Sequence, residues 1–361
     1  MCSFTAAPLG PTRIPGLDAR FPSAAEASSS LRRGDVIEIQ GPASSGKTHL
    51  LYDLIGTCIL PGGNSTNGGG GWDKVAILFD SDGCFDIRRL AQLLRARLGL
   101  HRMSSHPSPS TELPDEGTDT LTRILRKVHI FRPSSSLQLA ASIANLSAYH
   151  AAQLPTCEIG LVAVDSMSAF YWQDRFHAEE ARLQAGARGL DTPLSHILNG
   201  LQKFRVSHGS VTVLTNWGLN LASSSSLDPS TNFHFYKQHL HHYPTLLHLN
   251  INTDASSVSV SHASTHPHLP ITHHITLNPW PNQHGTRLAA DSTEQQTDDR
   301  CIPLTEGCDI IGVVKTAGSD VVGAFNVRVK LDEILIENGR HDLQQYSSEH
   351  LIHSSHNSLP S

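Results

Sequence analysis

Residues 35–60 read DVIEIQGPASSGKTHLLYDLIGTCIL, and this stretch decides the fold class. DVIEIQ (35–40) predicts a strand, and the residues after 46 carry apolar side chains at helical spacing. Between the two elements, GPASSGKT (41–48) has the GxxxxGKT spacing of a phosphate-binding loop. A chance Gly/Ser loop is the alternative, but the spacing, the lysine and both flanking elements agree. We therefore predict a nucleotide-binding α/β domain.

Each part of this loop has a physical role in holding a triphosphate. Gly41 lets the strand turn sharply, and Gly46 permits close approach of the backbone to a phosphate. The amides from Ala43 to Thr48 point at phosphate oxygens, where the helix N-terminus adds its positive end. Lys47 supplies a charge for the outer phosphates, and the Thr48 hydroxyl can ligate Mg²⁺. We therefore predict ATP and Mg²⁺ as cofactors. The predicted nucleotide contacts are Gly41, Pro42, Ala43, Ser44, Ser45, Gly46, Lys47 and Thr48.

Further apolar runs alternate with helical patterns along the chain, which predicts a parallel sheet with right-handed crossovers. The alternation in 271–277 predicts a half-exposed strand, and 310–316 with 323–329 predict a terminal hairpin. The other predicted strands cover 75–80, 128–132, 159–165 and 210–215, and the predicted helices cover 84–98, 136–152 and 193–207.

Carboxylates follow two of the buried strands. Asp165 ends the run 159–165 and is predicted to lie near the metal, although an Asp that caps the next turn is an alternative that does not exclude this role. Asp80 and Asp82 are candidates for orienting an attacking water, and Asp82 is the better placed by analogy with other phosphate-loop ATPases. The Asp82 side chain is one methylene shorter than that of Glu. A water held about 1 Å off line costs on the order of a hundredfold in rate.

Composition divides the chain into a flexible N-terminal segment (1–33), a core (34–336) and a disordered tail (337–361). Low-complexity insertions interrupt the core at about 61–71, 103–119, 219–270 and 289–306.

The net charge of −6 and the pI of about 6.4 exclude a strongly basic nucleic-acid-binding composition. Six cysteines without a disulfide-framework spacing predict a reduced, intracellular compartment. No apolar stretch approaches the length needed to cross a bilayer, so no membrane partner is expected.

Two further stretches carry a resemblance to a known family. DSDGCFDIRRL (80–90) and LVAVDSMSAFYWQDR (161–175) resemble the RecA-type recombinase core and, within it, the eukaryotic recombinase paralogues of homologous recombination. The resemblance covers 33–216 well and 271–330 loosely. It implies a RecA-like ATPase core in a nuclear subunit of a paralogue complex. Such a complex assists the main recombinase on single-stranded or branched DNA.

The resemblance also implies roles for individual residues. Lys47 and Thr48 match the nucleotide-contacting pair, and Asp165 matches the magnesium-associated aspartate. Asp82 falls where active recombinases carry their catalytic Glu. Arg89 falls where an active recombinase lays an Arg against adenine; an outward surface arginine is the alternative.

Three departures from active recombinases weaken turnover and DNA binding. Glu is replaced by Asp82, and the γ-phosphate-sensing Gln is replaced by Trp217, whose indole cannot act as an amide does. From 206 to 286 the only Lys or Arg is Lys237, although phosphate contacts need cations. The segment 171–192 is slightly acidic. We therefore predict a slow ATPase at most, with weak DNA binding by the isolated chain. The alternatives are a competent DNA-dependent ATPase performing strand exchange and an unrelated P-loop kinase.

Three weaker signals stay open at this point. Phe4–Ala7 has the form Phe-x-x-Ala of a subunit plug, against a plain disordered terminus. The histidines of 233–244 suggest either zinc or a low-complexity linker, and the second is favoured. The aromatic triplet 170–172 suggests base stacking or packing in the core or between subunits, and packing is favoured.

Overall fold

The computed structural model describes residues 9–18, 31–62, 70–100, 116–185, 192–221, 235–240, 243–244, 269–279, 308–319 and 322–339. The Phe4–Ala7 motif, most of the insertions and the segment 340–361 lie outside these described residues.

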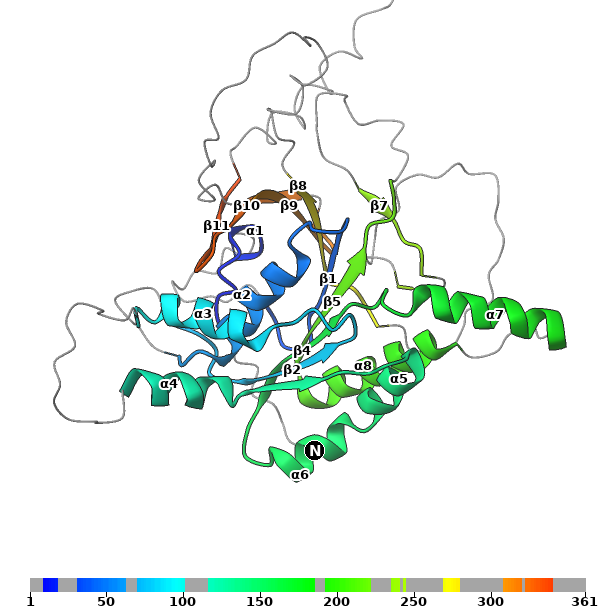
Figure 1. Cartoon of the computed structure of the whole chain (residues 1–361), viewed down its shortest axis with the longest axis horizontal. Helices are drawn as coiled ribbons and strands as arrows, with labels where there is room; N and C mark the ends of the chain where they lie inside the picture. Colours follow the sequence, from blue (N-terminus) through cyan, green and yellow to red (C-terminus); the bar gives the residue numbers. More distant parts are fainter. Residues whose placement is uncertain are drawn as a thin grey trace, which may run out of the picture.

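A nine-stranded sheet forms the centre of the molecule, in the order β11-β10-β9-β8-β1-β5-β4-β2-β3 (Figure 1). The pairs from β3 to β8 are parallel, and β8 to β11 are antiparallel. The predicted α/β class with a C-terminal hairpin is therefore confirmed. The strands are β1 Val36–Gly41, β2 Val75–Asp80, β3 Val128–Phe131, β4 Ile159–Asp165, β5 Val211–Trp217, β8 His273–Pro279, β9 Cys308–Thr316, β10 Val322–Val329 and β11 Ile334–Asn338; β6 Asn220–Leu221 and β7 Tyr236–Lys237 pair separately.

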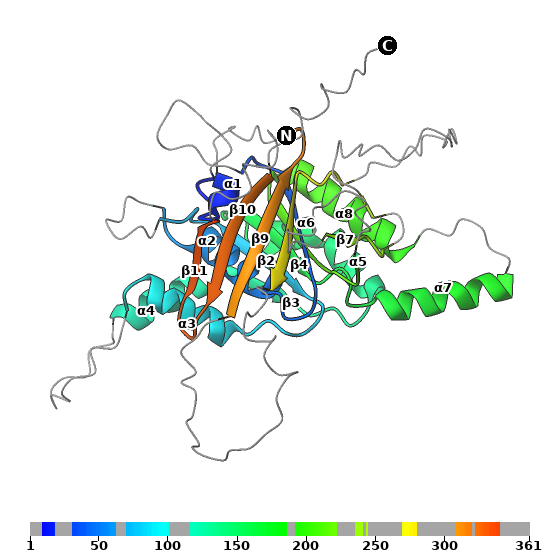
Figure 2. The same ribbon diagram turned by 90° about the horizontal axis from the view of Figure 1, so that it is seen from above.

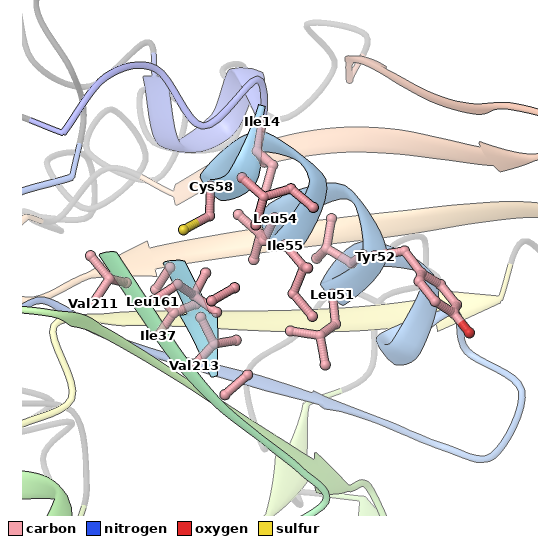
Figure 3. Close-up of a cluster of buried hydrophobic side chains, with 14 of the residues drawn as sticks. Ile14, Ile37, Leu51, Tyr52, Leu54, Ile55, Cys58, Leu161, Val211 and Val213 are labelled. Carbon is pink, nitrogen blue, oxygen red and sulfur yellow. The ribbon is translucent and has the colours of Figure 1, made fainter. Parts of the chain in front are cut away.

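Helices cover both faces of this sheet, which explains why β2 and β4 are apolar up to their final Asp. One buried cluster joins the sheet to α2 and α3, and a second joins it to α5 and α8. Figure 3 shows Leu54, Ile55 and Cys58 of α2 above Ile37 and Val213 of the strands. The helices are α1 Pro15–Asp18, α2 Lys47–Ile59, α3 Ile87–Arg97, α4 Glu116–Leu125, α5 Ser136–Ala144, α6 Leu146–Gln153, α7 Tyr171–Ala185 and α8 Pro193–His208.

The predicted helix 136–152 is wrong as a single element. Asn145 ends α5, and its side-chain amide donates to the carbonyl of Ala141 at 2.9 Å, so α6 starts as a separate helix. Asn competes for backbone groups in this way, which makes it a poor residue inside a helix.

The half-exposed strand predicted over 271–277 is also wrong in its burial. Five of the seven residues of β8 are buried, because β8 lies inside the sheet between β1 and β9. The sequence prediction missed β11, which pairs with β10 and extends the expected hairpin to a third strand (Figure 2).

Residues 9–18 pack on the core within the segment expected to be flexible. Ile14 and Leu17 are fully buried, and the Asp18 carboxylate accepts from the backbone N–H groups of Thr12 at 2.9 Å and Arg13 at 2.7 Å. The division of the chain into domains otherwise stays a prediction. Among the helices in the described ranges, none combines the length and the apolar character that a bilayer crossing requires.

Candidate nucleotide-binding site

The loop 41–48 joins the end of β1 to the start of α2, as the sequence predicts. Gly46 takes φ +83° at the N-cap of α2, and a Cβ there would lie 2.4 Å from the Ile310 side chain. A Cβ on Gly41 would lie 2.7 Å from the carbonyl oxygen of Leu277. A side chain is therefore excluded at both positions, because β8 and β9 lie against the loop.

The Lys47 side chain turns back toward the first residues of the loop. Its Nζ donates to the carbonyl of Gly41 at 2.9 Å and to that of Pro42 at 2.6 Å. Burial lowers the pKa of Lys47, while the negative charges of Asp165 and Asp82 act in the opposite direction. The lysine thus lies within the field of both candidate carboxylates, and a phosphate at this position would compete with the loop carbonyls for its ammonium.

The Asp165 carboxylate lies beside the loop and is held by two hydroxyls. Thr48 Oγ1 donates to Oδ2 at 2.9 Å, and Thr215 Oγ1 donates to Oδ1. Burial raises the pKa of Asp165, although the two hydroxyl contacts lower it in part. Oxygen ligands of this kind suit Mg²⁺, so Thr48 and Asp165 are the pair that could hold it.

Sequence reasoning missed Thr215 as a member of this site. Its signal was a threonine at the end of the apolar run 210–215, whose carboxyl end lies at the same sheet edge as that of β4. The Thr215 carbonyl also accepts from the backbone N–H of Met167 at 2.9 Å, which ties the turn after β4 to β5.

The two aspartates after β2 have different surroundings. Asp80 is buried and accepts from Arg132 Nε at 3.0 Å, so its carboxylate is committed to the packing of β2 against β3. Asp82 is exposed, and its Oδ2 accepts from Ser166 Oγ at 2.9 Å. Since Ser166 follows Asp165 directly, the structure brings Asp82, and not Asp80, to the candidate site.

Arg89 lies on α3 and reaches the C-terminal strands. Its Nη2 donates to the carbonyl of Lys330 at 2.5 Å, and its Nη1 donates to Gln92 Oε1 at 3.2 Å. Burial lowers the pKa of His49 on α2, and the positive charge of Arg89 adds to this effect. Arg89 is therefore near α2, but within the described part of the chain no hydrogen bond joins it to the phosphate loop. Both roles considered for Arg89, an adenine contact and an outward surface arginine, therefore stay predictions.

Trp217 ends β5 beside the start of the loop. It is half-buried, and its backbone N–H donates to Ser168 Oγ at 3.0 Å. The next residue, Gly218, donates its N–H to the Gly41 carbonyl at 2.7 Å. The tryptophan thus occupies the sheet edge where the expected glutamine would face the site.

The weaker sequence signals have mixed outcomes. Trp172 is 59% exposed on α7, so core packing is wrong for this residue, and packing between subunits stays a prediction. Tyr171 contacts the His239 ring at 4.8 Å between centroids. In the part of the chain that the structure describes, no three His, Cys, Asp or Glu side chains are placed to hold a metal ion. His241 and His242 lie outside that part.

Comparison with known proteins finds relatives over about half of the chain. No protein-family model matches. The chain is 32% identical over 148 residues to the DNA repair protein XRCC2 of Mus musculus, covering 41% of this chain and 45% of that protein. It is 29% identical over 206 residues to the DNA repair protein XRCC2 homolog of Arabidopsis thaliana, covering 51% of this chain and 55% of that protein. The matched region therefore resembles XRCC2-like RAD51 paralogues.

A third relative is named as a RAD51 homolog. The DNA repair protein RAD51 homolog 1 of Arabidopsis thaliana is 29% identical over 199 residues, covering 55% of this chain and 47% of that protein. The fold is therefore a RecA-like core. The chain spans about half the length of the curated relatives it matches. The matches to XRCC2 proteins confirm the resemblance that the sequence indicated.

Proposed function

We propose that this protein is an ATP-binding, XRCC2-like subunit of a recombinase-paralogue complex that acts in homologous-recombination DNA repair in the nucleus. Its partners are other recombinase paralogues and the main recombinase, on single-stranded or branched DNA. The observation that carries the proposal is the juxtaposition of Lys47, Thr48 and Asp165 at one sheet edge. These groups match the charges of a Mg-triphosphate, and the relatives' names support a role in DNA repair.

The site supports holding a nucleotide more than cleaving it. Asp82 is the group nearest in role to a water-orienting base, but its carboxylate is exposed and accepts from Ser166. A shorter carboxylate at that position holds water less well in line. Trp217 supplies no amide to sense a γ-phosphate. Slow hydrolysis is the expected result.

The isolated chain is expected to bind DNA weakly. Lys237 is the only Lys or Arg between 206 and 286, and phosphate contacts depend on such cations. On α7, Arg175 is already engaged, with Glu179 Oε1 at 2.9 Å and the Tyr171 hydroxyl at 3.3 Å. DNA contacts are therefore a property of the assembled complex.

Titration calorimetry with Mg-ATP tests the proposal on the full chain. Lys47→Ala should weaken the Kd at least about tenfold, since hydrogen bonds to a charged group are lost. Lys203→Ala, a lysine on α8 far along the sequence from the loop, is the matched control and should bind as the wild type does. Equal Kd values for all three proteins would refute nucleotide binding by this loop.

A pull-down with mass spectrometry tests the partner assignment. Recovery of recombinase paralogues with the wild type, and fewer with Lys47→Ala, is expected because a ligand of the folded loop stabilises the surfaces that abut it. Fast hydrolysis stimulated by single-stranded DNA and abolished by Lys47→Ala would instead support the competent ATPase. Phosphoryl transfer to a small molecule would support the kinase.

A further inference from the structure

The His49 side chain lies on α2, directly beside the phosphate loop, and is half-buried. It follows Thr48 in the sequence, and its ring makes an edge contact with the Tyr52 ring at 6.1 Å between centroids. Among the residues that the structure describes, neither ring nitrogen of His49 has a hydrogen-bond partner. A neutral imidazole carries one donor and one acceptor, so both are free for a ligand.

The charges around His49 place it between the candidate magnesium pair and α3. Burial lowers the pKa of His49, and the positive charge of Arg89 on α3 adds to this effect. Tyr52 lies one turn further along α2. Burial raises the pKa of Tyr52, and smaller effects on it are a lowering by Arg89 and a raising by Asp165. The side of α2 that carries His49 and Tyr52 is therefore close both to Asp165 and to the first turn of α3.

Direct contacts fix the start of α3 against this side of α2. The Tyr52 hydroxyl accepts from the backbone N–H of Asp86 at 2.8 Å and donates to the Asp86 carbonyl at 3.2 Å. The Tyr52 ring also packs on the Phe85 ring at 4.5 Å between centroids. Figures 1 and 2 both show α3 beside α2. The first turn of α3 is therefore held in place one helical turn beyond His49.

The other sides of the loop leave no room for a nucleoside. A Cβ on Gly46 would lie 2.4 Å from the Ile310 side chain, so β9 closes the loop on one side. Toward the sheet, Leu50 and Leu51 of α2 are fully buried in the core. The candidate magnesium pair takes a third side. The sugar and the base of a nucleotide held in the loop would therefore extend toward α3, past His49.

We propose that His49 binds the ribose of the nucleotide and makes the site prefer ribonucleoside triphosphates over their deoxy forms. This inference rests on the proposed ATP-binding function. The sugar joins the phosphates to the base, so a side chain that directly follows Thr48 and faces α3 is placed to meet it. Each ribose hydroxyl can pair with either nitrogen of a neutral imidazole. Because burial and the Arg89 charge lower the pKa of His49, the ring is neutral at pH 7.

Packing against Tyr52 is the alternative role of His49, and this role needs neither ring nitrogen. Phenylalanine keeps an aromatic ring at the position but has no donor and no acceptor, so His49→Phe separates the two roles. Loss of one neutral hydrogen bond corresponds to a loss of affinity of about threefold to tenfold. The variant should therefore lose the preference for the ribose hydroxyls and keep the packing contact.

Titration calorimetry on the full chain, with the magnesium forms of ATP, 2′-deoxyATP and 3′-deoxyATP, measures this preference. The wild type should bind ATP at least about threefold more tightly than one of the two deoxy forms, and His49→Phe should bind ATP and that form equally. His196→Phe, at an exposed histidine of α8, is the matched control and should keep the wild-type ratio. An unchanged ratio in His49→Phe would overturn the proposal, as would wild-type Kd values that do not depend on the sugar.

Histidine NMR with ¹³C at Cε1 locates the sugar on the wild-type chain itself. The His49 signal is the one absent from the spectrum of His49→Phe, and the unfolding transition of that variant checks that it folds. Mg-ATP should shift the His49 signal in a saturable way. Inorganic triphosphate with Mg²⁺ should shift it much less, because triphosphate carries no sugar. Equal shifts with the two ligands, or no shift with Mg-ATP, would overturn the proposal.

Failure of this inference can be told apart from failure of the proposed function. If Mg-ATP does not saturate the wild type in calorimetry, nucleotide binding by the loop and the ribose contact are both wrong. If Mg-ATP saturates the wild type but the wild type and His49→Phe show the same dependence on the sugar, only the ribose contact is wrong.

Discussion

Replacing Thr215 by Val removes one of the two hydroxyls that hold the Asp165 carboxylate, with little change in side-chain shape. Thr215 and Asp165 are both buried, so water cannot replace the lost donor. Loss of a hydrogen bond to a charged group should lower the free energy of unfolding by about 1.5–3 kcal/mol at pH 7. Thr48 Oγ1 remains as the second donor, at 2.9 Å, which keeps the loss in that range.

The effect of Thr215→Val should depend on pH in a defined direction. Burial raises the folded-state pKa of Asp165 above its unfolded value of about 3.9, so the folded chain holds this proton more tightly. The Asp165 contribution therefore favours folding on acidification and is lost as pH rises through that window. Because the hydroxyl stabilises the charged form, Val raises the pKa further. The difference from the wild type should be largest at pH 7 and shrink toward pH 4.

Urea unfolding at several pH values measures this difference, and a double-mutant cycle with Asp165→Ala, which removes both acceptor oxygens, isolates the pair. The cycle should give a coupling of about 1–2 kcal/mol, since the two side chains are in direct contact. A Thr215→Val loss that is the same at pH 4 and pH 7, with no coupling to Asp165→Ala, would refute the assigned hydrogen bond.

Three other predictions use single variants with matched controls. Gly46→Ala should weaken Mg-ATP binding at least about tenfold in calorimetry, because φ +83° and the neighbouring Ile310 side chain both exclude a Cβ. Gly83→Ala is the control: Gly83 has φ +66°, but a Cβ there would lie in open space, so Mg-ATP binding should not weaken. Glu38→Gln should cost about 1–3 kcal/mol in urea unfolding, because the buried Oε2 that lies 2.8 Å from His274 Nδ1 becomes an NH₂ group that cannot accept, while Oε1 keeps its two amide donors. The exposed Glu337→Gln should cost little. If Arg89 contacts adenine, Arg89→Ala should weaken the binding of ATP but not the binding of inorganic triphosphate. Equal ATP affinities of the wild type and the variant would refute the adenine contact and leave Arg89 only its hydrogen bond to the Lys330 carbonyl.

The parts of the fold that sequence predicts well are those decided by local pattern. β2 and β4 are apolar up to their final Asp, and the phosphate loop carries its own spacing and glycines. The helix break at Asn145 and the burial of β8 escaped prediction because they depend on neighbours that periodicity does not show. The packing of residues 9–18 likewise depends on a surface formed by strands at the other end of the chain.

The candidate site divides in the same way. Lys47, Thr48 and Asp165 were predictable, since each stands at a fixed place relative to a strand end. Thr215 was not, because its role requires that the carboxyl ends of β4 and β5 lie side by side. The buried Glu38 shows the same limit, since its contact with His274 Nδ1 at 2.8 Å joins residues 236 positions apart. Functional residues that lie within one short stretch can be predicted from the sequence, whereas residues that come together only across the sheet cannot.

The same long-range assembly has a consequence for the phosphate loop. Gly41 accepts from Gly218 at 2.7 Å and cannot carry a Cβ because of Leu277, and Gly46 lies against Ile310. The loop conformation therefore depends on β5, β8 and β9 together. A ligand that binds the folded loop must stabilise these strands by linkage, including strands that follow the loop by more than 200 residues. Mg-ATP should accordingly slow hydrogen exchange in β8 and β9 as well as in α2. Protection confined to α2 would mean that the loop and the C-terminal strands fold independently.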